Sequence, residues 1–310
     1  MTRLPTILVI LVFAGSLALA LGASIVFARR LDRLGSRFGW PEAIVGLLTA
    51  TAADAPELSS AVIAIAHGSS AVGVGVVVGS NLFNLAAMVG AVALVARAPI
   101  RIGRRELVQE AGVALAVTGA ATLVLAGALP AWIGLAACGV AAFLYLEGLD
   151  LPTRPPGSLR TRARAIGIAA VELPAIALIA LGSLGMVNAA LVLADRWDIP
   201  DVVVGMVVLA WLTSLPNAFT AFRLGLAGRG DALVSEALHS NSINMVGGLV
   251  IPALFVTITG VSAAGLALLF ALTALTLAPL ARSGRLGRQA GAAIVLAYVA
   301  AAAILVATGS

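Results

Sequence analysis

The chain has 310 residues, of which 61% are hydrophobic and only 11% are charged, and its mean hydropathy is +1.09. Soluble globular domains carry about 25% charged residues, so this composition excludes a water-soluble fold and a disordered protein. The net charge is +5, but the arginines that produce it lie between apolar segments, so no nucleic-acid partner is expected. A single cysteine, Cys138, excludes a disulfide framework and a cysteine-rich metal cluster.

Ten apolar segments, each long enough to cross a bilayer, follow one another along the chain. A membrane-spanning helix needs about 20 apolar residues. The first segment is long and lacks a clear cleavage site, which favours a retained helix over a signal peptide. The sequence therefore predicts an all-α integral membrane protein with ten transmembrane helices. The expected spans cover residues 5–28, 42–66, 70–96, 106–127, 130–149, 166–194, 201–222, 232–257, 261–281 and 289–308.

The positions of the arginines predict the orientation in the membrane. All 19 basic residues are arginine; 17 lie in the connections that follow the odd-numbered segments, and only Arg3 and Arg196 lie on the opposite side. Basic loops stay on the cytoplasmic side. We therefore expect a multi-pass protein of the inner (plasma) membrane, surrounded by lipid bilayer, with these five connections in the cytoplasm and both termini outside.

The chain divides into two halves with related patterns. Residues 151–164 hold three prolines and four arginines, and they are predicted to form a cytoplasmic linker between a first five-helix repeat, 1–150, and a second, 165–310. Five spans in each half require the second copy to be inverted, which is the plan of many secondary transporters. The segments that correspond are Trp40 to Gly46 with Ile199 to Gly205, and Gly79 to Asn84 with His239 to Asn244.

The second segment carries two acidic residues deep inside its apolar run. Asp54 and Glu57 are three residues apart and so share a helix face. A carboxylate in hydrocarbon is costly unless it faces a partner or a wet cavity. Pro56 lies between them and leaves a backbone oxygen near Ala52 without its helical donor. The pattern predicts an ion site, although a kinked helix with one protonated, structural acid is the alternative.

Three further segments carry polar side chains at helical spacing. Carboxylate, hydroxyl, amide and carbonyl oxygens suit hard cations such as Ca²⁺ or Na⁺ rather than Zn²⁺ or Cu⁺. Hydrogen bonding between helices is the alternative use of such residues in membranes. The additional candidate ligands are Ser80 and Asn84 in the third segment, Thr213, Ser214 and Asn217 in the seventh, and Ser240 and Asn244 in the eighth.

With these motifs the chain resembles the Ca²⁺/cation antiporter superfamily, which includes the Na⁺/Ca²⁺ exchangers. The first signature matches Ala55-Pro56-Glu57-Leu58 and Gly79 to Asn84, and the second matches Thr213-Ser214-Leu215-Pro216. The resemblance implies alternating access and competition of sodium and calcium for one site. It implies no cofactor, with Na⁺, Ca²⁺ or H⁺ as transported cations. It further implies that the site is lined by Glu57, Ser80, Asn84, Thr213, Ser214 and Ser240.

Several positions depart from the family pattern. The second signature ends in Asn217 where the family has glutamate, and Asn244 stands where it often has aspartate. The expected central acids are therefore Asp54 and Glu57. Glu236 lies one turn before Ser240, and it is either a third acid of the site or a residue nearer the cytoplasmic mouth.

Two residues near these motifs are open to more than one interpretation. His239, which replaces a glycine of the family pattern, either titrates in the cavity or only forms hydrogen bonds. Glu110, in the fourth segment, is expected to pair with arginines of the cytoplasmic connections.

Four functions follow from these features. The leading hypothesis is a secondary cation antiporter of the Na⁺/Ca²⁺ exchanger type, not an enzyme. A Na⁺/H⁺ or cation/H⁺ antiporter that does not carry Ca²⁺ is the first alternative, because two ionised carboxylates balance one Ca²⁺ or two Na⁺ and can also carry protons. A transport-inactive homologue is the second. A membrane enzyme is disfavoured, because the two histidines lie in different halves and Ser80 has no evident base.

Overall fold

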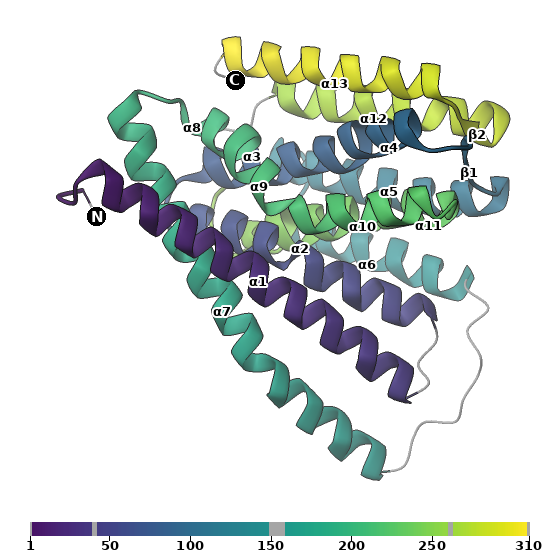
Figure 1. Cartoon of the computed structure of the whole chain (residues 1–310), viewed down its shortest axis with the longest axis horizontal. Coiled ribbons are helices and arrows are strands. Elements are labelled where there is room, and N and C mark those ends of the chain that lie inside the picture. The colour runs from purple at the N-terminus through teal and green to yellow at the C-terminus, as the bar shows by residue number, and fades with distance from the viewer. Residues whose placement is uncertain (1, 39–41, 149–158, 260–262, 309–310) are drawn as a thin grey trace.

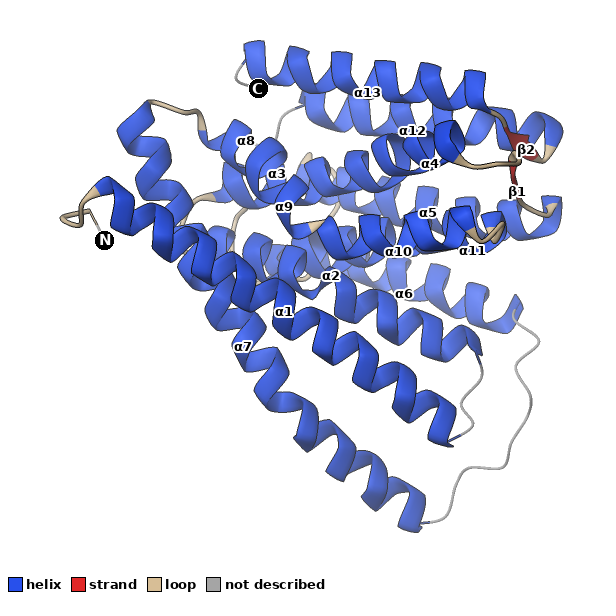
Figure 2. Ribbon diagram, in the orientation of Figure 1, coloured by secondary structure: helices blue, strands red, loops and turns tan. Residues whose placement is uncertain are grey.

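The computed structural model describes residues 2–38, 42–148, 159–259 and 263–308, and this part of the chain is almost entirely helical (Figures 1 and 2). The first half contains α1 (Thr6–Phe38), α2 (Glu42–Ala66), α3 (Ser70–Leu82), the π-helix η1 (Phe83–Met88), α4 (Val89–Val95), β1 (Ile100–Arg101), α5 (Arg104–Leu125) and α6 (Ala131–Gly148). The second half contains α7 (Leu159–Trp197), α8 (Asp201–Val203), the π-helix η2 (Val204–Leu209), α9 (Ala210–Thr213), α10 (Leu215–Leu226), α11 (Gly230–Met245), the π-helix η3 (Val246–Val250), the 3₁₀-helix η4 (Pro252–Leu254), α12 (Ala263–Ser283), β2 (Arg285–Leu286) and α13 (Arg288–Thr308).

Each predicted span overlaps one helix or one series of consecutive helices. Within the described residues, five helices are long and apolar enough to cross a membrane. The series from α8 to α10, which bends by 50° at its break, makes a sixth. The predicted all-α membrane fold is confirmed, and the count of ten spans in two repeats stays a prediction. Of the predicted linker 151–164, residues 151–158 lie outside the described residues, and α7 already begins at Leu159.

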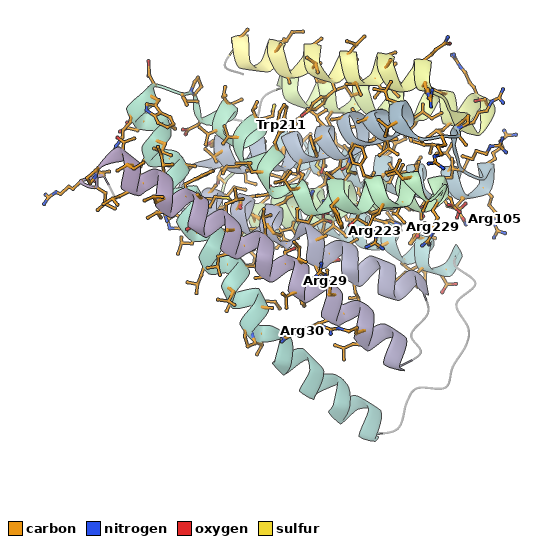
Figure 3. All side chains as sticks on the ribbon, in the orientation of Figure 1. Arg29, Arg30, Arg105, Trp211, Arg223 and Arg229 are labelled. Atoms are coloured by element: carbon orange, nitrogen blue, oxygen red, sulfur yellow. The ribbon has the colours of Figure 1, made fainter. Side chains whose placement is uncertain are left out.

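The outer helices present large apolar side chains to their surroundings. Examples are Trp132, Phe143, Leu181 and Leu296, which are between 59% and 69% exposed. A soluble protein does not leave contiguous apolar surface of this kind uncovered. The side chains that project from the outer ribbons in Figure 3 therefore suit contact with lipid. Cys138 is buried and free, as expected of a small residue in an apolar run.

The ends of the helices that adjoin the arginine-rich connections gather at one end of the molecule (Figure 1). At this end β1 and β2 form a two-residue antiparallel ladder that pairs Ile100 with Leu286. The labelled Arg105, Arg223 and Arg229 lie in the same half of the view (Figure 3). The sequence did not predict the ladder, because a two-residue pairing leaves no periodic pattern.

The centre of the molecule is built from α2, α3, α10 and α11, with α1 and α7 crossing on one side and α4, α12 and α13 on the other (Figure 1). Close approach in the centre depends on glycine. Gly79 of α3 packs directly against the backbone of Met206, and Gly205 of η2 packs against the carbonyl group of Val72. Small residues let helices in a membrane approach until their backbones touch. The π-helical segments η1, η2 and η3 all belong to this central region.

A reciprocal pair of hydrogen bonds joins α3 to α11. The Asn81 side chain donates to the Asn241 carbonyl oxygen, and the Asn241 side chain donates to the Asn81 carbonyl oxygen, each over 3.1 Å. These two residues occupy equivalent places in the two related motifs of the sequence. The pair therefore fixes the register of α3 against α11 next to the polar side chains described below.

The backbone contact at Gly79 leads to a stability prediction. In Gly79→Ala the added methyl group meets backbone atoms of Met206, so the variant should lose about 1–3 kcal/mol of stability and melt at a lower temperature in detergent. Gly139→Ala, at a helix position with open space, is the matched control and should melt like the wild type. Equal melting temperatures for both variants would contradict the proposed packing.

Candidate functional site

Nine of the predicted site residues lie buried where four segments of the central region meet. All of them are at most 1% exposed. Because the segments come from both halves of the chain, only the tertiary fold unites these side chains. The nine are Asp54 and Glu57 of α2, Ser80 of α3, Asn84 of η1, Thr213 of α9, Ser214 and Asn217 at the start of α10, and Ser240 and Asn244 of α11.

Glu57 is the centre of the cluster. Its Oε1 accepts a hydrogen bond from the Ser214 hydroxyl group over 2.5 Å and a longer one from the Asn217 amide over 3.4 Å. Its Oε2 accepts from the Asn244 amide over 2.5 Å. Hydrogen bonds to a carboxylate are stronger than those between neutral groups. Glu57 therefore holds α2, α10 and α11 together.

Asp54 is satisfied on one side only. Its Oδ1 accepts a hydrogen bond from the Asn217 amide over 2.6 Å, so Asn217 bridges the two carboxylates. Its Oδ2 is buried and has no hydrogen-bond partner among the described residues. One oxygen of this acid is therefore available to a ligand.

The local backbone explains how the carboxylates are placed. α2 continues as one helix through Pro56, and the carbonyl oxygen of Ala52, which proline leaves without a helical donor, accepts a hydrogen bond from Ser24 of α1 over 2.7 Å. The carbonyl oxygen of Pro56 accepts from Ser60 over 2.6 Å and from Ser183 of α7 over 3.4 Å. Helices α1 and α7 therefore anchor the acidic turn through its own backbone.

The helix break in the second half positions Ser214. This residue has φ −80° and ψ 0° and lies between α9 and α10, and Pro216 is the second residue of α10. Proline has no N–H group to continue the hydrogen bonding of the preceding helix. The chain bends by 50° at this break, and the Ser214 side chain is directed at Glu57.

Several buried oxygen atoms of the cluster have no partner. Buried polar atoms without hydrogen bonds are rare in folded proteins, and each costs about 1–3 kcal/mol. Such a set of oxygens fits a hard cation. The described residues contain no group of three or more histidine, cysteine and acidic side chains that could hold a metal, so amide and hydroxyl oxygens would complete any coordination. The unpartnered oxygens are Asp54 Oδ2, Asn84 Oδ1, Asn217 Oδ1, Asn244 Oδ1 and Ser240 Oγ, and the Asn84 amide nitrogen is unpartnered as well.

Two predicted hydroxyl ligands and one residue that the sequence analysis missed complete the cluster. The Thr213 hydroxyl donates to the Leu209 carbonyl over 2.8 Å. The Ser80 hydroxyl donates to its own helix and accepts from Asn244 over 3.3 Å. Asn244 also donates to the side-chain oxygen of Asn81 over 3.3 Å. Asn81 lies inside the Gly79 to Asn84 motif, so its position in the motif was the available signal.

A second polar cluster lies beside the first and corrects the prediction for Glu110. This buried carboxylate accepts hydrogen bonds from Tyr145 of α6 and Ser235 of α11, each over 3.0 Å. Its other oxygen lies 2.8 Å from Nε2 of His239. Glu110 is thus satisfied inside the bundle by α6 and α11 instead of by a loop arginine. His239 thus contacts Glu110, and both interpretations of this residue stay predictions.

Glu236 is the one predicted acid that no hydrogen bond among the described residues joins to the central cluster. It lies on α11, and its Oε2 is buried without a partner. The carboxyl groups of Asp54 and Glu57 act on it electrostatically. It is thus close to the cluster but outside its hydrogen-bond network.

A multi-pass helical protein with buried carboxylates and unpartnered oxygens at its centre has the features of membrane proteins that handle inorganic cations. Comparison with known proteins gives the family. The family model described as sodium/calcium exchanger protein matches residues 8–146 and 169–307. The chain belongs to this family, and the resemblance seen in the motifs is confirmed.

Individual relatives agree with this assignment. The chain is 28% identical over 250 residues to the inner membrane protein YrbG of Escherichia coli (strain K12), which covers 74% of each chain. Its fold is similar to that of the sodium-calcium exchanger NCX_Mj, with a TM-score of 0.66 and 19% identity over 97% of this chain and 100% of the other. It is also similar to the H⁺/Ca²⁺ exchanger CAX, with a TM-score of 0.73 and 15% identity over 97% and 86% of the two chains.

The hydrogen bond between Glu57 and Asn244 leads to a prediction. Asn244→Leu removes the donor to a buried carboxylate, so it should destabilise the protein by about 1–3 kcal/mol. In a Glu57→Met background, Asn244→Leu should reduce the stability of the protein much less, because no carboxylate remains at position 57 to accept the hydrogen bond. Melting temperatures of the two single variants and the double variant measure this coupling.

Thr122→Val supplies the control for this cycle. Its hydroxyl group bonds to the Thr118 carbonyl oxygen on α5, away from Glu57, so its effect should add to that of Glu57→Met. Additive effects for Asn244→Leu as well would contradict the role of Glu57 as the centre of the cluster.

Proposed function

We propose that this protein is a secondary active cation antiporter of the Na⁺/Ca²⁺ exchanger type that moves cations by alternating access through the central cluster. The observation that carries the proposal is a set of five buried oxygens, four on neutral side chains and one on Asp54, that have no hydrogen-bond partner among the described residues. Charged residues inside a membrane protein are costly and usually serve function. Because the chain belongs to the sodium/calcium exchanger family, cation binding is the expected use of these oxygens.

The proposed ligands divide into two groups by charge. Asp54 and Glu57 supply the negative charge, and the neutral oxygens complete the coordination shell that a dehydrated cation requires. Two ionised carboxylates balance one Ca²⁺ or two Na⁺, so one site can serve both ions in turn. The neutral ligands are Ser80, Asn84, Thr213, Ser214, Asn217, Ser240 and Asn244; all seven are buried.

The orientation and the repeat are part of the same proposal. The family model matches two separate stretches of the chain, and the reciprocal Asn81–Asn241 hydrogen bonds relate equivalent positions of the two halves. This supports two inverted five-helix repeats, 1–150 and 165–310, that meet near the membrane midplane. The helix ends that adjoin the arginine-rich connections lie at one end (Figure 1). This supports a cytoplasmic position for that end in the inner membrane and outside positions for both termini.

A second candidate is a Na⁺/H⁺ or cation/H⁺ antiporter that does not carry Ca²⁺. The observation in its favour is that Asn217 and Asn244 donate hydrogen bonds to the carboxylates at positions where the family signature has acids. The site therefore has less negative charge with which to attract a divalent cation. Transport measurements separate the two candidates.

Flux in proteoliposomes tests the proposed function. Vesicles with an outward Na⁺ gradient, or with a pH gradient, should take up radioactive Ca²⁺, and Glu57→Gln should reduce this uptake to background because it removes the central charge. Glu147→Gln, which changes an exposed acid of α6, is the control and should transport like the wild type.

Each other outcome of the flux measurement has a clear meaning. Na⁺-dependent proton movement without Ca²⁺ uptake would establish the second candidate. No cation-dependent flux of any kind, in protein that is folded and reconstituted, would contradict both and favour the transport-inactive homologue.

Restoring an acid should raise the affinity for calcium. Asn244→Asp places a third carboxylate beside Glu57, and a gain of about 1.4 kcal/mol in binding corresponds to a tenfold increase in affinity. We expect the Ca²⁺ concentration for half-maximal uptake to fall about tenfold on this basis. Asn188→Asp on α7, where the amide donates to the Leu184 carbonyl of its own helix, should leave this concentration unchanged. Equal effects of both substitutions would contradict a local role of Asn244.

A further inference from the structure

Glu236 is an acid that the central cluster does not use. The face of α11 that carries Ser240 and Asn244 also carries Glu236, because the three residues are spaced by four. At 1.5 Å per residue, Glu236 lies about 6 Å from Ser240 and about 12 Å from Asn244 along the helix. α11 begins near the arginine-rich end of the molecule (Figure 1). Glu236 therefore lies between the cluster and that end.

The surroundings of Glu236 provide no partner for its buried oxygen. The basic side chain nearest in sequence, His239, contacts Glu110 at 2.8 Å, and Glu110 also accepts from Tyr145 and Ser235. Oε2 of Glu236 remains without a hydrogen bond among the described residues. One oxygen of Glu110 thus accepts hydrogen bonds and the other has the His239 ring within 2.8 Å, whereas Oε2 of Glu236 has neither kind of contact among the described residues.

Two other oxygens without a hydrogen-bond partner among the described residues belong to the part of the cluster next to Glu236. Ser240 is 1% exposed with its Oγ unpartnered, and Asp54 is fully buried with its Oδ2 unpartnered. The Ser240 side chain lies beside the Asp54 carboxyl group, and Glu236 interacts electrostatically with the same carboxyl group. Oxygens on α2 and α11 therefore face one another on the side of the cluster that is nearer the arginine-rich end.

We infer that Glu236, Ser240 and Asp54 form a second cation subsite between the central cluster and the arginine-rich end of the protein. The inference rests on the proposed function, and it names Na⁺ or Ca²⁺, two hard cations, as ligands. Asp54 and Ser240 belong to both sites, and because Asp54 is shared, a cation passes from Glu236 to Glu57 without leaving carboxylate coordination. Such a step lowers the cost of moving a dehydrated ion through an apolar bundle.

Equilibrium binding tests the subsite without requiring transport. Purified wild type and Glu236→Gln are titrated with radioactive Na⁺ and with radioactive Ca²⁺. Glu236→Gln should bind one cation fewer per protein, or bind one about tenfold more weakly, for at least one of the two ions. Glu236→Asp should restore part of the loss, and Glu147→Gln should have no effect. Melting temperatures verify that each variant is folded.

Transport measured separately from each side of the membrane tests where the subsite lies. In vesicles that present the arginine-rich end to the medium, Glu236→Gln should raise the KM for the cation about tenfold, while vesicles of the opposite orientation should show a much smaller change. Unchanged binding in folded Glu236→Gln, or equal KM changes from both sides, would overturn the inference. Absence of flux in the wild type with cation binding lost only at Glu236 would reject the proposed transport function and retain the subsite.

Discussion

The structure depends on the cost of placing Asp54 and Glu57 on one face of a helix inside an apolar bundle. Carboxylates in such a place need donors or a bound cation. Three of their four oxygens receive hydrogen bonds from Ser214, Asn217 and Asn244, and these donors come from the other half of the chain. The break between α9 and α10 and the close packing of α11 follow from this requirement, because both bring donors to Glu57.

The helices in the centre must also be held together around the two carboxylates. Little hydrophobic force drives helices together within a membrane, so contact between small residues and hydrogen bonds must hold them. Gly79 and Gly205 bring α3 and η2 to backbone contact, and Asn81 and Asn241 fix α3 against α11. The polar cluster is therefore enclosed by surfaces that cannot separate without loss of these contacts.

Most helices and the acids of the site could be predicted from the sequence, because apolar runs and the Pro56–Glu57 pattern are local signals. Contacts between distant segments could not. Ser24 of α1 satisfies the carbonyl oxygen of Ala52, and nothing in the sequence around Ser24 marks that role. Glu110 was expected to bind a loop arginine, yet the fold places Tyr145, Ser235 and His239 within reach. Partner choice for a buried charge depends on which helices pack together, and spacing along one helix does not contain that information.

The amide groups of Asn217 and Asn244 have a consequence for the energy of the cluster when no ion is bound. Each donates a hydrogen bond to a carboxylate, while its own carbonyl oxygen has no partner among the described residues. An amide can thus donate a hydrogen bond to a carboxylate when no ion is present. When an ion binds, the same amide can coordinate it through its carbonyl oxygen. Carboxylates at these two positions would repel Asp54 and Glu57 in the empty state. With amides there, the difference in free energy between the ion-bound and ion-free forms of the cluster is smaller. In the proposed antiporter, the electrostatic barrier against returning without an ion would therefore be lower.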